Sequence, residues 1–147
     1  MRHCPVFIAV ILLLMCGCST SRTYNYPDRM QTLPQHYAQF DLQLAWEVKQ
    51  VDRSTVIDGV VKNMRYHEMN GLEIWVSTLD TDGKEVHRAA DFVYTLKENE
   101  VAQFTLTIPR AASGSRLRFL YRYIGNDGGG DSDGASSWMQ SFEAGVP

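Results

Sequence analysis

Cysteine is scarce in this 147-residue chain, and its three cysteines, Cys4, Cys16 and Cys18, all lie near the amino terminus. The rest of the chain therefore has no thiol that could form a disulfide, act as a nucleophile or bind a metal. Basic residues are not in excess either, because 14 Lys and Arg stand against 17 Asp and Glu, for a net charge of −3. Nucleic-acid-binding domains carry clustered basic surface, so nucleic acid is not an expected partner.

The chain also lacks the motifs of common catalytic and cofactor chemistry. It has no Gly-x-Ser-x-Gly elbow, no His-Glu-x-x-His and no phosphate loop. His36, His67 and His87 are scattered among polar residues, and a histidine stands beside an acidic residue only at His67-Glu68. Two ligands do not complete a metal site. We therefore expect no enzyme activity, no metal and no cofactor.

Long hydrophobic runs are absent as well. The longest, residues 6–15, has ten residues, whereas a membrane-spanning helix needs about 20. It follows the basic start of the chain at Arg2 and precedes the small residue Gly17, which is the layout of a secretory signal peptide. We expect residues 1–17 to be a signal peptide that is removed on export.

The end of this segment, Met15-Cys16-Gly17-Cys18, resembles the lipobox of bacterial lipoproteins. Cys16 is the poorer candidate for the modified cysteine, because the large Met15 would then precede the cleavage point. The resemblance implies that Cys18 is acylated, with palmitate among its lipids, and anchors the mature protein in a membrane. Ser19 follows it, where the family's inner-membrane signal would be Asp. The resemblance thus implies an outer-membrane lipoprotein that faces the periplasm.

Residues 19–39 are polar and contain Pro27 and Pro34. We expect residues 18–39 to be the lipidated N-terminus and a tether, and residues 40–147 to be one folded domain. From residue 40, apolar residues alternate with polar ones, a period that predicts a half-buried strand: Phe40, Leu42, Leu44, Trp46 and Val48. Residues 33–51 also carry apolar side chains every three or four positions, as on a helix face. The strand is favoured because the rest of the chain is β-like.

Further strands are predicted at residues 55–63, 72–79, 86–96, 104–108 and 117–123, with a last one around Trp138 and Phe142. Asp82-Gly83 predicts a hairpin turn, residues 64–71 are expected to be irregular, and residues 97–100 form a charged turn. About seven short strands indicate an all-β, immunoglobulin-like sandwich of two sheets. Its predicted core contains Leu44, Trp46, Val61, Ile74, Val76, Phe104, Leu106, Phe119 and Tyr121.

Residues 56–124 resemble the FxLYD-type domains of bacterial and archaeal envelope proteins. The resemblance is carried by Gly59-Val60-Val61-Lys62-Asn63, by residues 76–84 with Asp80 in the place of the family's aspartate, and by residues 96–104, where a polar turn leads into a strand with Phe104. It implies an immunoglobulin-like fold and brings no catalytic residue with it.

Two groups of side chains are candidate contacts for a ligand or partner. Arg116, Arg118 and Arg122 share one face of a predicted strand and would either bind an anionic ligand or pair with acidic residues on neighbouring strands. Trp75 lies opposite the apolar phase of its strand and is either exposed for binding or covered. With Tyr66 it offers aromatic surface to sugars or proteins. The sequence leaves two functions open, a non-catalytic interaction module of the cell envelope or a carbohydrate- or small-ligand-binding accessory lipoprotein.

The segment from Gly125 to Gly134 is rich in Gly and Asp. Asn126, Asp127, Asp131 and Asp133 offer oxygen ligands of the kind calcium prefers. The spacing is only part of an EF-hand pattern, and the glycines make the loop costly to order. We expect a mobile, solvated loop rather than a calcium site.

Overall fold

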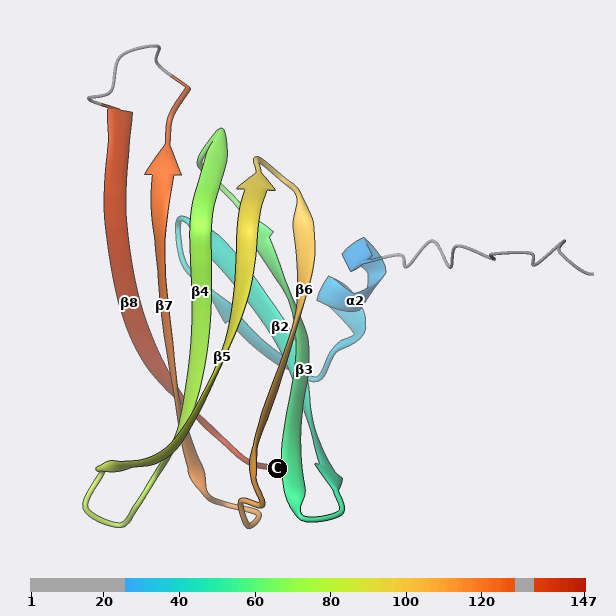
Figure 1. Ribbon diagram of the computed structural model, residues 1–147. Coiled ribbons are helices and arrows are strands. Elements are labelled where there is room, and N and C mark those ends of the chain that lie inside the picture. The colour runs from blue at the N-terminus through green and yellow to red at the C-terminus, as the bar shows by residue number, and fades with distance from the viewer. Residues whose placement is uncertain (1–25, 129–133) are drawn as a thin grey trace, which may run out of the picture.

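The computed structural model describes residues 26–128 and 134–147, which form two antiparallel sheets packed face to face (Figure 1). The first sheet has the strand order β1-β2-β3-β6 and the second sheet the order β5-β4-β7-β8. The elements are α2 (Tyr26–Thr32), β1 (Gln35–Ala38), β2 (Leu42–Val51), β3 (Ser54–Asn63), β4 (Glu68–Leu79), β5 (Glu85–Lys97), β6 (Val101–Pro109), β7 (Arg116–Asn126) and β8 (Ala135–Gly145). The predicted two-sheet sandwich is confirmed.

The alternation that begins near residue 40 forms a strand, not a helix. β2 pairs along its whole length with β3, from Leu42 opposite Asn63 to Val51 opposite Ser54. The side chains of Leu44 and Trp46 are buried in the core, as predicted. Phe40 is an exception, because it precedes the strand and is 48% exposed.

The domain begins earlier than predicted. β1 pairs with β2 from Gln35 opposite Trp46 onward and is an eighth strand in what was expected to be a tether. α2 lies against the outer side of the first sheet (Figure 1). The sequence did not predict that residues 26–38 belong to the folded domain, because this segment has few apolar side chains. Residues 1–25, which include Cys18 and the predicted signal peptide, lie outside the described residues.

Two apolar side chains and the ion pairs of Arg29 with Asp58 and, at 3.8 Å, with Glu47 hold α2 in place. Met30 and Leu33 pack on Ala45 and Val60, two small residues that point outward from the first sheet and are fully buried by this contact. The Arg29 guanidinium donates to the Asp58 carboxylate at 3.0 Å. No helix among the described residues is long and apolar enough to span a membrane.

The core lies between the sheets and contains all nine residues predicted for it. Aromatic rings fill its centre. The Trp46 ring from the first sheet lies 4.7 Å from that of Phe119 in the second, measured between centroids, and Phe119 stacks on Phe142 at 4.8 Å. The first sheet and the second sheet are therefore joined by direct ring contacts.

One buried amide connects the two sheets at the end of β3. The Asn63 side chain donates to the carbonyl oxygens of Tyr66 at 2.7 Å and Leu96 at 2.9 Å, and it accepts from the amides of Arg65 and Tyr66. These bonds fix the chain where it passes between sheets. The irregular segment is shorter than predicted, because β4 already begins at Glu68.

Candidate functional site

The outer face of the second sheet is interrupted by a bulge in β4. Asn70 lies opposite Ile124 of β7 and Glu73 opposite Arg122, so β4 has one residue more than β7 over this stretch. The bulge includes Gly71, whose φ is +61°, a left-handed conformation that glycine adopts without steric cost. The middle of this face therefore has a position with no side chain.

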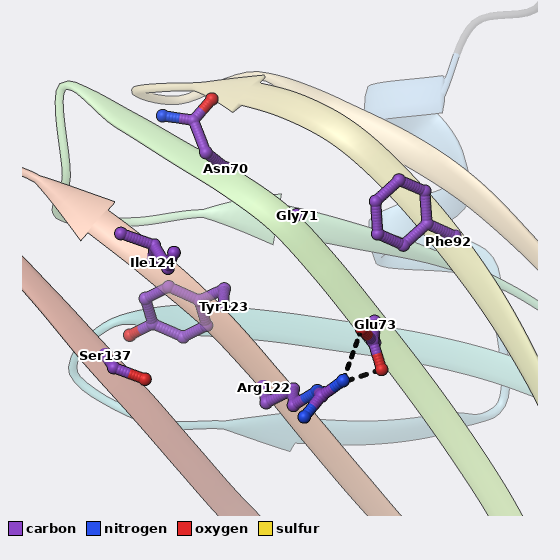
Figure 2. Close-up of a pocket in the computed structure, with 8 residues that line it drawn as sticks. All are labelled: Asn70, Gly71, Glu73, Phe92, Arg122, Tyr123, Ile124 and Ser137. Atoms are coloured by element: carbon purple, nitrogen blue, oxygen red, sulfur yellow. Dashed lines mark hydrogen bonds and ion pairs between the residues drawn. The ribbon is translucent and has the colours of Figure 1, made fainter.

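A hollow of about 310 Å³ lies over the bulge (Figure 2). Phe92 of β5 stands on one side of Gly71 and Ile124 of β7 on the other. All four strands of the second sheet contribute to the lining: Asn70, Gly71, Glu73, Phe92, Arg122, Tyr123, Ile124 and Ser137. A Cβ at Gly71 would lie 4.0 Å from the Phe92 ring, so a side chain there would narrow the hollow as well as strain the backbone.

A charged pair forms one wall of the hollow. Arg122 donates from Nε and Nη2 to the two carboxylate oxygens of Glu73, at 2.9 and 2.8 Å, which is the bidentate geometry that Arg favours. These hydrogen bonds raise the pKa of Arg122. The guanidinium carbons of Arg122 and of Arg88 each lie 5.2 Å from the Trp75 ring centroid. Trp75 is therefore half-buried between two cations.

Large apolar side chains are exposed around the hollow. Four of them lie on this face: Phe92 (43%), Tyr94 (82%), Ile124 (50%) and Met139 (67%). The Phe92 and Tyr94 rings meet edge to face, with centroids 4.7 Å apart. The other exposed large apolar residues of the described chain, Phe40, Val51 and Val86, lie singly in a loop or at strand ends. Four of the seven exposed large apolar side chains of the described residues thus lie on one sheet face.

The three arginines of β7 point to this face, as predicted, and each is paired with an acidic residue. Besides the pair of Arg122, Arg118 lies 2.9 Å from Glu143 and 3.7 Å from Glu85. Arg116 lies 3.6 Å from Glu143. The structure therefore favours cross-strand pairing over the alternative of a free cationic surface.

Tyr66, predicted as a ligand contact, lies in the core instead. Its side chain is 2% exposed, and its ring meets that of Tyr123 edge to face at 5.6 Å. Gly125 makes room for it, because a Cβ there would come within 2.7 Å of the ring. The sequence gives no sign of this burial, since it depends on β7, which is remote in the chain.

The sequence also missed the main residues of the hollow. Phe92, Tyr94 and Leu96 share one phase of the strand predicted at residues 86–96, and that phase was not assigned to either face of the sheet. Only Leu96 is buried. Gly71 was placed at the end of an irregular segment, and neither residue type nor spacing indicates a bulge there.

The remaining candidates do not form a site within the described chain. His36, His67 and His87 are exposed and lie on different elements. Over residues 26–128 and 134–147, no group of three His, Cys, Asp or Glu side chains is arranged to hold a metal. Asp131 and Asp133 lie outside the described residues, so the expected solvated loop stays a prediction.

No family model matches the chain, and no curated protein matches it in sequence. Among solved structures it is similar to the GAE domain of GGA2p from Saccharomyces cerevisiae, with a TM-score of 0.50 and 12% identity over 77% of this chain and 96% of that one. It is also similar to the yeast GGA1 GAE domain, with a TM-score of 0.48 and 12% identity over 77% and 99%. GAE domains have an immunoglobulin-like sandwich fold. The predicted immunoglobulin-like fold is therefore confirmed, and at this identity the likeness shows the fold alone.

Proposed function

We propose that this chain is a lipid-anchored cell-envelope protein that binds a protein partner, without catalysis or a cofactor, through the outer face of the second sheet. The observation that carries the proposal is the group of four exposed apolar side chains on this face: Phe92 and Ile124 line the hollow over Gly71, Tyr94 contacts Phe92, and Met139 lies opposite Arg122. Contiguous apolar patches on a globular domain mark contact surfaces. Cys18 is the proposed anchor, and the outer membrane, on its periplasmic side, is the proposed location.

The face has the layout of a protein-binding surface. Its centre is apolar and concave, while Asn70 and Ser137 add polar groups at the margin, and protein interfaces combine an apolar centre with a polar rim. Glu73 and Arg122 neutralise each other, so the wall of the hollow has little net charge. A hollow of about 310 Å³ suits one large apolar side chain of the partner, inserted between Phe92 and Ile124.

The carbohydrate alternative has less support. Sugars stack on a free aromatic face, whereas the Trp75 ring already has the guanidinium groups of Arg88 and Arg122 over it. Tyr66 is buried and is withdrawn as a contact. The resemblance to FxLYD-type domains remains part of the proposal and agrees with an envelope role, although it names no partner.

The anchor is tested by the mature N-terminus of the protein made in cells. Mass spectrometry should find a diacylated or triacylated Cys18 as the first residue. Cys18→Ser should leave an unprocessed precursor without lipid. A mature terminus at any other residue would contradict the proposed anchor and would leave the proposal for the sheet face untouched.

The binding face is tested by two matched charge substitutions. Ile124, in the face, and Val51, at the end of β2, are 50% and 48% exposed, so Ile124→Glu and Val51→Glu cost similar solvation. Envelope complexes of the tagged full-length protein would be purified after mild cross-linking. We expect a stoichiometric partner to be retained by the parent protein and by Val51→Glu, and lost from Ile124→Glu. Equal retention by both variants would overturn the proposed face.

A further inference from the structure

Three of the four edge strands of the sandwich are protected against pairing with another strand. An edge strand exposes unpaired backbone N–H and C=O groups, and natural sheets shield them by short length, charged residues, proline or cover. β1 has only four residues. β5 carries charged side chains along its length, and β6 ends at Pro109.

A side-chain hydrogen bond between the edge strands β5 and β6 closes the side of the sandwich where these two strands lie. The two strands lie side by side (Figure 1), and the Asp91 carboxylate of β5 accepts a hydrogen bond from the Thr105 backbone amide of β6 at 2.8 Å. A second carboxylate oxygen of Asp91 accepts from the amide of Phe92 at 2.8 Å. A backbone donor at the β6 edge is thus occupied by a side chain of the same molecule.

Within residues 26–128 and 134–147, the β8 edge has none of these protections. β8 runs for 11 residues, contains neither proline nor a basic residue, and has Glu143 as its single charge. That charge is directed to its own sheet, where Arg118 donates to it at 2.9 Å. Among the described residues, one side chain reaches the β8 backbone, Gln35, whose amide is 3.5 Å from the Gly145 oxygen at the far end of the strand.

We propose that β8 pairs antiparallel with β8 of a second copy of this chain, which joins the two second sheets into one continuous sheet. This inference does not depend on which partner binds the outer face. The strand is suited to a copy of itself, because its outward side chains at Ser137, Met139 and Ser141 are uncharged and the charge of Glu143 is paired with Arg118. Like charges directly opposite each other would disfavour such pairing.

A second copy satisfies the edge better than a separate peptide does. A peptide strand added to β8 would present a new open edge of its own. When β8 meets β8, the continuous sheet ends at two β5 strands, and both are shielded by charge and by the contact of Asp91 with β6. The interface is isologous, so the assembly closes as a dimer and cannot grow.

The symmetry of this pairing also agrees with the proposed anchor. Antiparallel pairing within a continuous sheet requires a two-fold axis perpendicular to it, so the outer faces of both second sheets point the same way. α2 lies on the opposite side of the sandwich, against the first sheet (Figure 1). Both chains therefore enter their domains from one side, as two lipids in one membrane require. The exposed Met139 of each copy comes to the middle of a doubled apolar face.

The test uses single cysteines in the full-length protein within its own membrane and a short thiol-to-thiol cross-linker. Ser137→Cys, Met139→Cys and Ser141→Cys sample the outward side of β8. Tyr94→Cys is the control, since Tyr94 is 82% exposed on the same face but lies on β5. The parent protein without an added cysteine controls for Cys18. We expect a product of twice the chain mass that peaks at one β8 position and is absent from Tyr94→Cys and from the parent.

Charge substitutions supply the second arm. Met139→Lys, combined with the cysteine that cross-links best among the other two positions, should abolish the product, because it places a positive charge from each copy near the middle of the paired β8 strands. Tyr94→Lys in the same background should leave it unchanged, and Ile124→Glu should lose the partner of the outer face while the β8 product persists. The proposed dimer would be overturned if no β8 cysteine gave a cross-linked product or if Tyr94→Cys gave as much. It would equally be overturned if the product contained a different protein, or if the product persisted with Met139→Lys.

Discussion

Apolar side chains point outward from the middle of both sheets, but among the described residues only those of the first sheet are covered by another segment of the chain. There α2 and Leu33 bury Ala45 and Val60 completely. An ion pair between Arg29 and Asp58 links this cover to β3. On the second sheet, Phe92 and Ile124 stand exposed around the hollow. The outer face of the second sheet, called the bare face below, is therefore the one available to another molecule.

The largest expected effect separates the inner and outer sides of the second sheet. Phe119 is fully buried and Phe92 is 43% exposed. Phe119→Ala should lower the free energy of unfolding by about 3–5 kcal/mol, because it opens a cavity in the core. Phe92→Ala should change it by only about 0.5 kcal/mol. Urea denaturation measures both, and a loss for Phe92→Ala as large as that for Phe119→Ala would place Phe92 in the core.

The next effect concerns the connection between the covered sheet and the bare one. Asn63→Ala removes four hydrogen bonds, three of them buried, that link the end of β3 to Arg65 and Tyr66 and to Leu96 of β5. Backbone groups left without partners should cost about 2–3 kcal/mol in total. The control, Asn70→Ala, removes one exposed bond to Thr95 and should cost a few tenths. Similar denaturation midpoints for the two variants would show that Asn63 does not connect the sheets.

A smaller effect isolates the cover on the first sheet. Arg29→Ala removes the ion pair with Asp58, in which the side chains are 17% and 22% exposed, and should cost about 1 kcal/mol. Hydrogen exchange should quicken in α2 while the strands stay protected. Lys49→Ala, which removes a more exposed pair with Glu47, should leave exchange in α2 unchanged. Uniform quickening in every strand would mean that the helix is integral to the sandwich rather than a cover on it.

The smallest effect concerns two tyrosines at the inner side of the second sheet. Their ionisation should lower the stability of the domain only at alkaline pH. Burial raises the pKa of Tyr121 and of Tyr123, whose hydroxyl donates to the buried Asp41. The folded pKa lies above the unfolded value of about 10, so this contribution to stability is complete below pH 10 and is lost as the pH rises further. The melting temperature should fall above pH 10, and less steeply in Tyr121→Phe. Identical alkaline slopes would contradict this assignment.

The covered and bare faces differ in how far the sequence predicts them. Period-two alternation along single strands is local, so Leu44, Ile74 and Phe119 were assigned correctly to the core. The same alternation placed Trp75 and the three β7 arginines on the outer face. The pairing partners of those arginines come from other strands, and alternation alone left two alternatives open for them.

Features that depend on contacts between distant segments escaped prediction. α2 has only Met30 and Leu33 to pack on the first sheet, which is too few for a recognisable pattern. Tyr66 is buried because Gly125 leaves space for its ring, and the hollow exists because β4 and β7 differ by one residue around Gly71. Spacing within one strand carries no information about register between two.

The most direct test compares the two outer faces in the living cell. A photo-reactive amino acid would replace Tyr94 on the bare face or Gln103, an exposed residue of β6 on the first sheet, one at a time in the full-length protein. We expect the photo-reactive residue at position 94 to cross-link to one envelope protein, in a discrete product whose mass differs from twice the mass of this chain. This product should disappear in Ile124→Glu. Gln103 should give none. The same product from both positions, or a product at Tyr94 that persists in Ile124→Glu, would contradict the claim that the bare face of the second sheet binds a partner.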